Sequence, residues 1–184
     1  MSGNEKAVPW PQHLILVGPM GAGKSCIGRT VAASLRLPFV DTDELVVNAA
    51  GMSIPQIFET SGEEAFRHAE TLAVKRLMYL PDSVIATGGG AVMREENWAY
   101  MLACGLVVRL VVSPEESFRR TRGGLTRPML GVPDRLERLR ELAQVRDPLY
   151  ALANLTVISE GRPITEVAAE VVEAYLEWKA ALDS

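Results

Sequence analysis

The sequence predicts an α/β protein in which a five-stranded parallel sheet lies between two layers of helices. Five short apolar runs alternate along the chain with longer segments that have helical periodicity. None of the connections between these runs is typical of a β-hairpin, so the strands should be parallel and covered on both faces. A length of 184 residues with 48% hydrophobic residues suits one globular domain. We therefore expect a three-layer sandwich.

The first strand of this sheet leads into a loop with the pattern of a phosphate-binding site. Gly18 is followed by four residues and then by Gly23, Lys24 and Ser25, after which a helix is predicted. Glycines let backbone N–H groups point at phosphate oxygens, and lysine adds a mobile positive charge. The Ser25 hydroxyl is placed to bind Mg²⁺ carried by a nucleotide. ATPases, GTPases and small-molecule kinases share this loop, so it does not identify the phosphate acceptor.

The other elements follow from hydrophobic periodicity and from helix start signals. A capping box at 61–64 predicts that the longest central helix begins at Ser61. A later helix is expected to begin at Asp134 and to end at Val145, before the segment 146–150. The expected strands are 14–17, 37–40, 83–86, 106–112 and 153–158, and the expected helices are 25–35, 61–80, 94–103, 113–122, 134–145 and 164–182.

Polar residues and glycines follow the second and third strands. Asp41 and Asp43 end the second strand, and Gly88, Gly89 and Gly90 come after the third. Open parallel sheets bind ligands at the carboxyl ends of their strands, which favours a site beside the phosphate loop. Two simpler interpretations remain: Asp43 could cap a helix that begins at Glu44, and the glycines could form a flexible turn.

Two further features contribute to the predicted site. Arg67 and Glu70 lie three residues apart on the long helix, where they could meet a ligand or form a solvated surface pair. Residues 122–134 are rich in glycine and proline and contain Arg127, a pattern typical of a lid or of a disordered segment. In a kinase this loop would be a lid that excludes water from the phosphoryl-transfer reaction. Residues 1–12 should form an irregular leader ahead of a single domain at 13–184.

Composition excludes several classes of protein. The formal net charge of −4 disfavours a nucleic-acid-binding surface. Cys26 and Cys104 have no partners at metal-binding spacing, so neither a zinc site nor a disulfide framework is expected. No apolar run has the length of about 18 residues needed for a membrane span, and no signal-peptide pattern is present, which predicts a cytoplasmic protein without membrane partners.

In its ordered motifs the chain resembles the shikimate kinases. The resemblance extends from about residue 13 to the last helix and rests on six blocks, at 18–25, 41–43, 64–70, 88–90, 127–130 and 146–150. It implies the fold of nucleoside monophosphate kinases and phosphoryl transfer from MgATP to the 3-hydroxyl of shikimate, in the route to chorismate and the aromatic amino acids. It also suggests a monomer. Cys26 and Met129 depart from the family's usual Thr and Leu, and neither change removes a charge.

The resemblance also implies roles for individual residues. Those implied to act in catalysis are Lys24, Asp43 and Arg127. Shikimate is implied to contact Asp43, Arg67, Glu70, Gly88, Gly89, Gly90 and Arg146. ATP is implied to contact Gly21, Ala22, Gly23, Lys24, Ser25, Cys26, Arg120, Arg127, Arg162 and Pro163, and Mg²⁺ is implied to be held by Ser25 and Asp41.

Two alternatives are weighed against this interpretation. Another small-molecule kinase of the same architecture, for example one acting on gluconate, would share the phosphate loop but would not need the combination of Arg67, Arg146 and the three glycines. A binding module without turnover would be expected to lose Lys24, Asp41 or Arg127, and all three residues are present.

Overall fold

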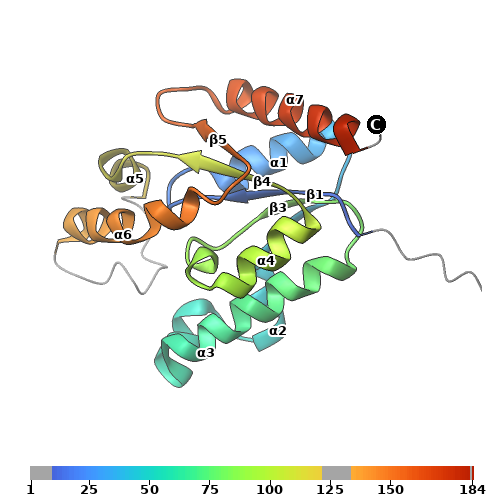
Figure 1. The fold of residues 1–184 in the computed structure, drawn as a ribbon. Helices are drawn as coiled ribbons and strands as arrows, with labels where there is room; N and C mark the ends of the chain where they lie inside the picture. Colours follow the sequence, from blue (N-terminus) through green and yellow to red (C-terminus); the bar gives the residue numbers. More distant parts are fainter. Residues whose placement is uncertain (1–9, 122–133, 183) are drawn as a thin grey trace, which may run out of the picture.

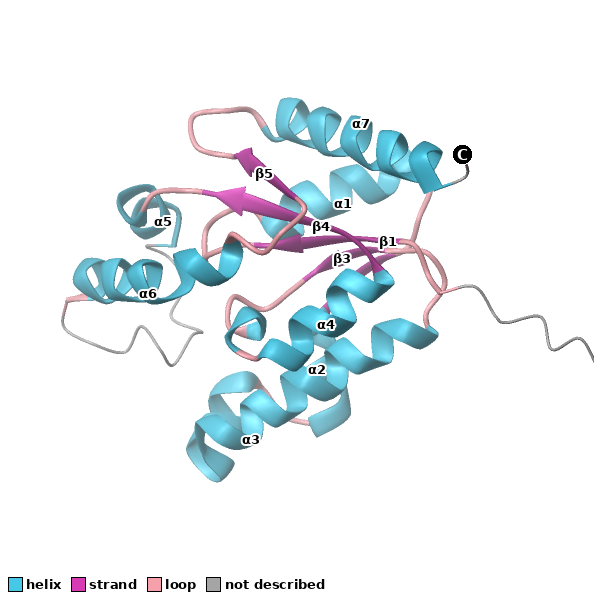
Figure 2. Cartoon of the chain, in the orientation of Figure 1, coloured by secondary structure: helices cyan, strands magenta, loops and turns pink. Residues whose placement is uncertain are grey.

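The computed structural model describes residues 10–121, 134–182 and 184. Most of the predicted leader and the predicted lid, including Arg127, lie outside the described residues. Within the described residues the chain forms a parallel sheet with helices on both faces, as expected (Figures 1 and 2).

The central element of the sheet is β1 (His13–Val17). It pairs in parallel with β3 (Val84–Ala86) on one side and with β4 (Gly105–Val111) on the other. The edges are β2 (Phe39–Asp41), next to β3, and β5 (Leu155–Ile158), next to β4, so the order is β2-β3-β1-β4-β5. The phosphate loop therefore leaves the middle of the sheet, with strand ends on either side of it.

Alternate residues of β1 face the two helical layers. Leu14 and Leu16 pack in the core that contains Val31 of α1 (Lys24–Leu35) and Val171 of α7 (Ile164–Leu182). Ile15 and Val17 pack in the opposite core, with Val74 of α3 (Ile54–Arg76) and Met101 of α4 (Glu95–Cys104). All four β1 side chains are fully buried. A strand buried on both faces explains why β1 is continuously apolar.

The remaining helices lie around the carboxyl ends of the strands. They are α2 (Thr42–Ala50), α5 (Pro114–Thr121) and α6 (Arg135–Tyr150), together with the short 3-10 turn η2 (Ala91–Met93). A second 3-10 turn, η1 (Leu77–Tyr79), lies at the amino ends of the strands, where the Leu77 carbonyl oxygen is 2.8 Å from His13 Nε2. In Figure 1 α5 and α6 lie at the end of the sheet toward which the β4 arrow points. No helix in the described part of the chain is long and apolar enough to cross a membrane.

The start of α3 differs from the prediction. The helix begins at Ile54 instead of Ser61, because Ser53 and Gln56 cap it: the Ser53 N–H donates to Gln56 Oε1 at 2.8 Å. Gly62, with φ of 81°, interrupts the helical backbone inside the element. The element therefore consists of two helical segments, the second of which begins next to the predicted start at Ser61, and the prediction missed the first segment.

Two other helix limits were also predicted wrongly. The helix after β2 begins at Thr42, and its N-cap is Asp41, whose Oδ1 accepts from the Asp43 N–H at 3.0 Å. Asp43 is therefore not the cap. The helix expected to end at Val145 continues through Pro148 to Tyr150, so Arg146 lies on α6 and not in a loop.

His13 is a fully buried polar residue at the start of β1. Its Nδ1 accepts from the Ser83 N–H at 3.1 Å, and its Nε2 lies 2.8 Å from the Leu77 carbonyl oxygen. This pattern requires a neutral ring with the proton on Nε2. Burial lowers the pKa of His13, although the Leu77 carbonyl and Asp82 partly oppose this.

We expect acidification below about pH 6.5 to destabilise the protein through His13. In that range the unfolded chain binds a proton that the folded chain excludes, so the free energy of unfolding falls by up to about 1.4 kcal/mol per pH unit. Urea unfolding between pH 7.5 and 5.5 measures this slope. The variant His13→Gln keeps one donor and one acceptor but does not titrate, and an unchanged slope in it would contradict the role of His13.

Candidate active site

The phosphate loop is held by its own lysine. Gly23 has a φ of 88°, which is unfavourable for residues with a side chain, and α1 starts immediately after it. Lys24 Nζ donates to the carbonyl oxygens of Gly18 and Pro19, at 2.7 and 2.9 Å. The ammonium group is thereby kept over the loop, at the N-terminal end of α1, where anions are favoured.

Helix α5 braces the same loop from the other side. Ser117 Oγ donates to the Met20 carbonyl oxygen at 2.5 Å, and Arg120 Nη1 donates to the Gly21 carbonyl oxygen at 3.0 Å. Arg120 Nη2 also reaches the Ser159 carbonyl oxygen at 3.1 Å. The helix that precedes the predicted lid is thus connected directly to the phosphate loop.

A cavity of about 480 Å³ lies on the phosphate loop. Its walls include Gly21, Gly23, Lys24, Ser25, Cys26, Asp41, Asp43, Arg120 and Arg162, which are predicted site residues. Of the other residues predicted to contact ATP, Ala22 is buried, Pro163 is not among the described residues that line the cavity, and Arg127 lies outside the described residues. The volume falls in the range of small-molecule sites.

Two oxygen-bearing side chains at the floor of this cavity fit a magnesium ion carried by a nucleotide. Ser25 Oγ donates to Asp41 Oδ2 at 2.9 Å, and both residues line the cavity. The described residues contain no cluster of three or more His, Cys, Asp or Glu side chains suited to a metal. Mg²⁺ usually takes one or two protein oxygens and completes its shell with phosphates and water, so the pair is sufficient.

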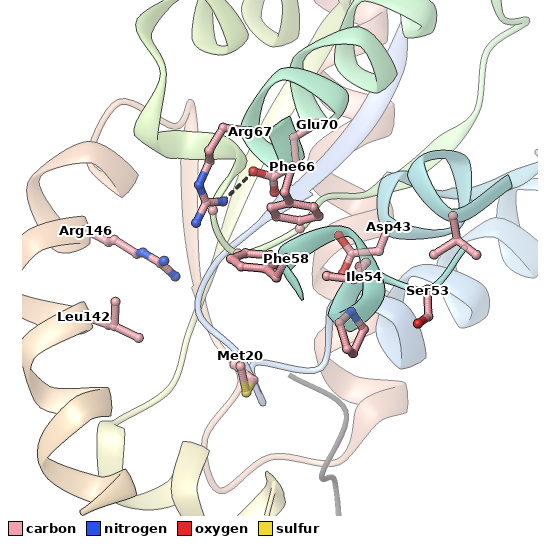
Figure 3. A pocket seen from close by; sticks show the side chains of 15 residues that line it. Met20, Asp43, Ser53, Ile54, Phe58, Phe66, Arg67, Glu70, Leu142 and Arg146 are labelled. Atoms are coloured by element: carbon pink, nitrogen blue, oxygen red, sulfur yellow. Dashed lines mark hydrogen bonds and ion pairs between the residues drawn. The ribbon is translucent and has the colours of Figure 1, made fainter. Parts of the chain in front are cut away.

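A second cavity, of about 420 Å³, opens beside the first. Figure 3 shows Arg67 from α3 and Arg146 from α6 directed into it, with Asp43 of α2 on the opposite side. Both arginines are about nine-tenths buried. Two guanidinium groups converging from separate helices form a site suited to a carboxylate, which arginine binds with two parallel hydrogen bonds.

Arg67 is fixed by two carboxylates. Its Nη1 donates to Glu70 Oε2 at 2.5 Å, and its Nη2 donates to Glu63 Oε1 at 3.0 Å. Burial lowers the pKa of Arg67, but the two glutamates outweigh this effect and raise the pKa above its ordinary value. Since Glu70 is only 2% exposed, the interpretation of the pair as a solvated surface contact is wrong.

The other buried charges are less fully compensated. Burial raises the pKa of the Glu70 carboxyl, and Arg67 offsets this only in part. Burial also lowers the pKa of Arg146, with a further contribution from the nearby Arg67. The two like charges therefore repel each other, and an anion bound between them would relieve this repulsion.

The glycines after β3 allow the charged side chains to approach the backbone. A Cβ atom on Gly88 would lie 2.5 Å from Asp43 Oδ1, and one on Gly90 would lie 1.8 Å from Arg67 Nη1. On Gly89 it would lie 3.6 Å from Arg146 Nη1, an ordinary contact. Close approach, and not only a flexible turn, therefore explains Gly88 and Gly90.

The sequence analysis missed several residues of the site. Thr42 Oγ1 accepts from the Gly88 N–H at 3.0 Å, and the Tyr150 hydroxyl donates to the Gly89 carbonyl oxygen at 3.0 Å. Both belong to blocks that the resemblance already marked, at 41–43 and 146–150. The apolar lining was attributed to core packing or left without a role, and it includes Met20, Val47, Ile54, Phe58, Phe66 and Leu142.

Asp43 and Met20 line both cavities. A phosphate chain on the loop and a second ligand between the arginines would therefore meet at the Asp43 carboxylate. This arrangement suits transfer of a phosphoryl group from one ligand to the other, because both reactants are held in one orientation.

Comparison with known proteins agrees with this geometry. A family model described as shikimate kinase matches residues 20–176. The chain is 46% identical over 164 residues to the shikimate kinase of Thioalkalivibrio sulfidiphilus, covering 89% of this chain and 86% of that one. Shikimate kinase from Acinetobacter baumannii, solved in complex with shikimate, superposes with a TM-score of 0.88 at 36% identity, covering 95% of this chain and 98% of that one.

A more distant neighbour helps to separate fold from family. A gluconokinase from Sinorhizobium meliloti has a TM-score of 0.63 and 17% identity, over 94% of this chain and 96% of that one, and so shares the fold alone. The family model and the relatives at higher identity go further, since 46% identity over 89% of the chain is shared with the Thioalkalivibrio sulfidiphilus protein. The chain belongs to the shikimate kinase family of ATP-dependent kinases.

Proposed function

We propose that the cavity on the phosphate loop binds ATP, that the cavity between the arginines binds shikimate, and that the chain phosphorylates the 3-hydroxyl of shikimate. The products are shikimate 3-phosphate and ADP, in the route to chorismate and the aromatic amino acids. The observation that carries this proposal is the position of Asp43 on the wall shared by the two cavities.

Arg67 and Arg146 hold the carboxylate of shikimate in this proposal. Their opposing positions orient the ring so that its hydroxyls face Asp43, whose carboxylate accepts hydrogen bonds from them. Glu70 keeps the Arg67 guanidinium in place. The three glycines at 88–90 form the floor, and their lack of side chains leaves room for these groups.

Asp43 is proposed to accept the proton of the attacking hydroxyl or to orient that hydroxyl. Lys24, together with Arg127 from the lid, neutralises charge that develops on the phosphate oxygens. Ser25 and Asp41 hold Mg²⁺, which supplies further charge neutralisation when it is bound with the nucleotide. Gly21, Ala22, Gly23 and Cys26 contact the phosphates, and Arg120, Arg162 and Pro163 contact the base.

Several broader predictions belong to this proposal. The catalytic unit is expected to span residues 13–184, with a lid at about 122–134 and a leader before it. We also expect a monomer in the cytoplasm that binds neither nucleic acid nor membranes. Size-exclusion chromatography with light scattering measures the oligomeric state.

The proposed reaction is tested by coupled ADP release with MgATP. We expect release that depends on shikimate and is near background with gluconate, with a nucleoside monophosphate or without an acceptor. Stimulation by gluconate alone would favour a different kinase of this fold. If ATP binds but no acceptor stimulates release, the chain is a binding module without turnover.

We expect Gly90→Ala to impair shikimate binding without unfolding the protein. A Cβ atom there would force Arg67 Nη1 out of its position and weaken its ion pair with the buried Glu70, so the thermal midpoint should fall as well. The KM for shikimate should rise about tenfold or more, because one charge-assisted interaction is weakened. Gly89→Ala, which makes only an ordinary contact, should have a smaller effect. Equal KM values in both variants would contradict this role for Gly90.

A further inference from the structure

The described part of the chain contains a second buried tyrosine–backbone contact that resembles the one beside the site but lies far from it. Tyr150 is 1% exposed, and its hydroxyl donates to the Gly89 carbonyl oxygen at 3.0 Å. Tyr175 on α7 is 2% exposed, and its hydroxyl donates to the Gln12 carbonyl oxygen at 2.5 Å. Neither contact has a part in the reaction described above, but they differ in what lies next to them.

Tyr150 lies one helical turn after Arg146 on α6, so the two side chains occupy the same face of the helix. The Tyr150 hydroxyl also interacts with the Arg146 guanidinium, and this contact partly offsets the lowering of the Arg146 pKa by burial. Gly89 also lies next to this guanidinium, since a Cβ atom on it would be 3.6 Å from Arg146 Nη1. One hydroxyl therefore connects Arg146 to the glycine loop.

The Tyr150 ring is also in contact with a charged side chain of the sheet. The Arg109 guanidinium of β4 lies 5.6 Å from the ring centroid and forms an ion pair with Asp147, the residue next to Arg146. The Tyr150 hydroxyl is protonated at neutral pH and donates to Gly89, and burial raises its pKa further, to about 12. The hydroxyl thus has a fixed position relative to both the sheet and the loop.

We propose that Tyr150 is a positioning residue for the shikimate kinase reaction, which holds the Arg146 guanidinium in the orientation that binds the substrate carboxylate. The inference rests on the proposed role of Arg146. A free arginine side chain has many rotamers, and restricting them before the substrate arrives lowers the entropy lost on binding. The effect should therefore fall on the binding of shikimate and not on the binding of ATP.

The test is a double-mutant cycle with Tyr150→Phe and Arg146→Ala in the full chain, measured as KM for each substrate and as kcat. Tyr150→Phe alone should raise the KM for shikimate about five- to tenfold, with the KM for ATP and kcat changed less than about twofold. In the Arg146→Ala background the same change should have almost no further effect on the shikimate KM. Tyr175→Phe, the matched control, should lose similar thermal stability but keep the wild-type KM.

Each result bears directly on the inference. A wild-type KM in Tyr150→Phe overturns it, and so do independent, multiplicative effects of the two changes, since Tyr150 would then act apart from Arg146. If Arg146→Ala raises the shikimate KM while Tyr150→Phe does not, only the positioning role fails. If Arg146→Ala itself leaves that KM unchanged, the proposed carboxylate site fails and the positioning role with it.

Discussion

Replacing Asp43 by asparagine should lower kcat by about 100- to 1,000-fold while the KM values for shikimate and ATP change only a few fold. Asparagine keeps the size of the side chain and one acceptor oxygen, so a ring hydroxyl can still be bound. It removes the negative charge and the capacity to accept a proton. An interaction needed mainly in the transition state lowers kcat when it is lost, and uniform binding is little affected.

The neighbouring Glu44 provides a matched control for this experiment. It lies next to Asp43 in the first turn of α2, and its carboxylate is 64% exposed and pairs with Arg29 at 3.1 Å. Glu44→Gln makes the same change of charge and should leave kcat within about twofold. Steady-state rates at saturating substrates, with the thermal midpoint of each variant, provide the comparison. Near-normal turnover in Asp43→Asn would eliminate Asp43 as a catalytic residue.

The sheet could be predicted from the sequence because its signal is local. Each strand is a short, mainly apolar run, and residues 14–17 of β1 are apolar without interruption because both faces of the strand are buried. The order of the strands is not local. It depends on which helical crossovers place β3 and β4 beside β1, so it cannot be predicted from any single segment of the sequence.

Helix limits were less predictable because competing signals lie close together. Ser61 and Glu64 form a good start signal, but Ser53 and Gln56 form another eight residues earlier, and α3 begins at the earlier one and is interrupted at Gly62, beside the later one. In α6, Pro148 is expected to end a helix. The burial of Arg146 and Tyr150 on one face of α6 instead favours continuation, so tertiary packing outweighs local propensity.

The charged residues of the candidate site could be named from the sequence, whereas their mutual placement could not. Arg67 and Arg146 are 79 positions apart, and only the fold brings their side chains into one cavity. Apolar lining residues such as Phe58 and Phe66 have the same spacing as core residues, and their ring contact at 4.9 Å resembles core packing. Thr42 and Tyr150 form hydrogen bonds with backbone atoms of Gly88 and Gly89, and such contacts cannot be predicted from a pattern of side chains.

Replacing Arg146 by alanine should raise the KM for shikimate by about 30- to 100-fold and leave the KM for ATP within about twofold. The arginine is one of two cations facing the proposed carboxylate site, and its removal leaves that carboxylate with Arg67 alone. Burial already lowers the pKa of Arg146, which means that its charge is costly in the free protein. Its loss should therefore affect binding more than folding.

For the same reason, replacing Arg146 tests the proposed carboxylate site more directly than replacing Arg67 does. Arg67→Ala would leave the buried Glu70 carboxylate without its main partner, so lost stability and lost binding would be mixed. Arg146→Lys keeps the charge but loses the planar pair of donors, and it should give an intermediate KM. Arg140→Ala, on the exposed side of α6 where Arg140 pairs with Glu115 at 2.9 Å, is the control and should match the wild type. An equal loss of affinity for ATP in Arg146→Ala would show that Arg146 does not act through the shikimate carboxylate, because Arg146 does not line the cavity proposed to bind ATP.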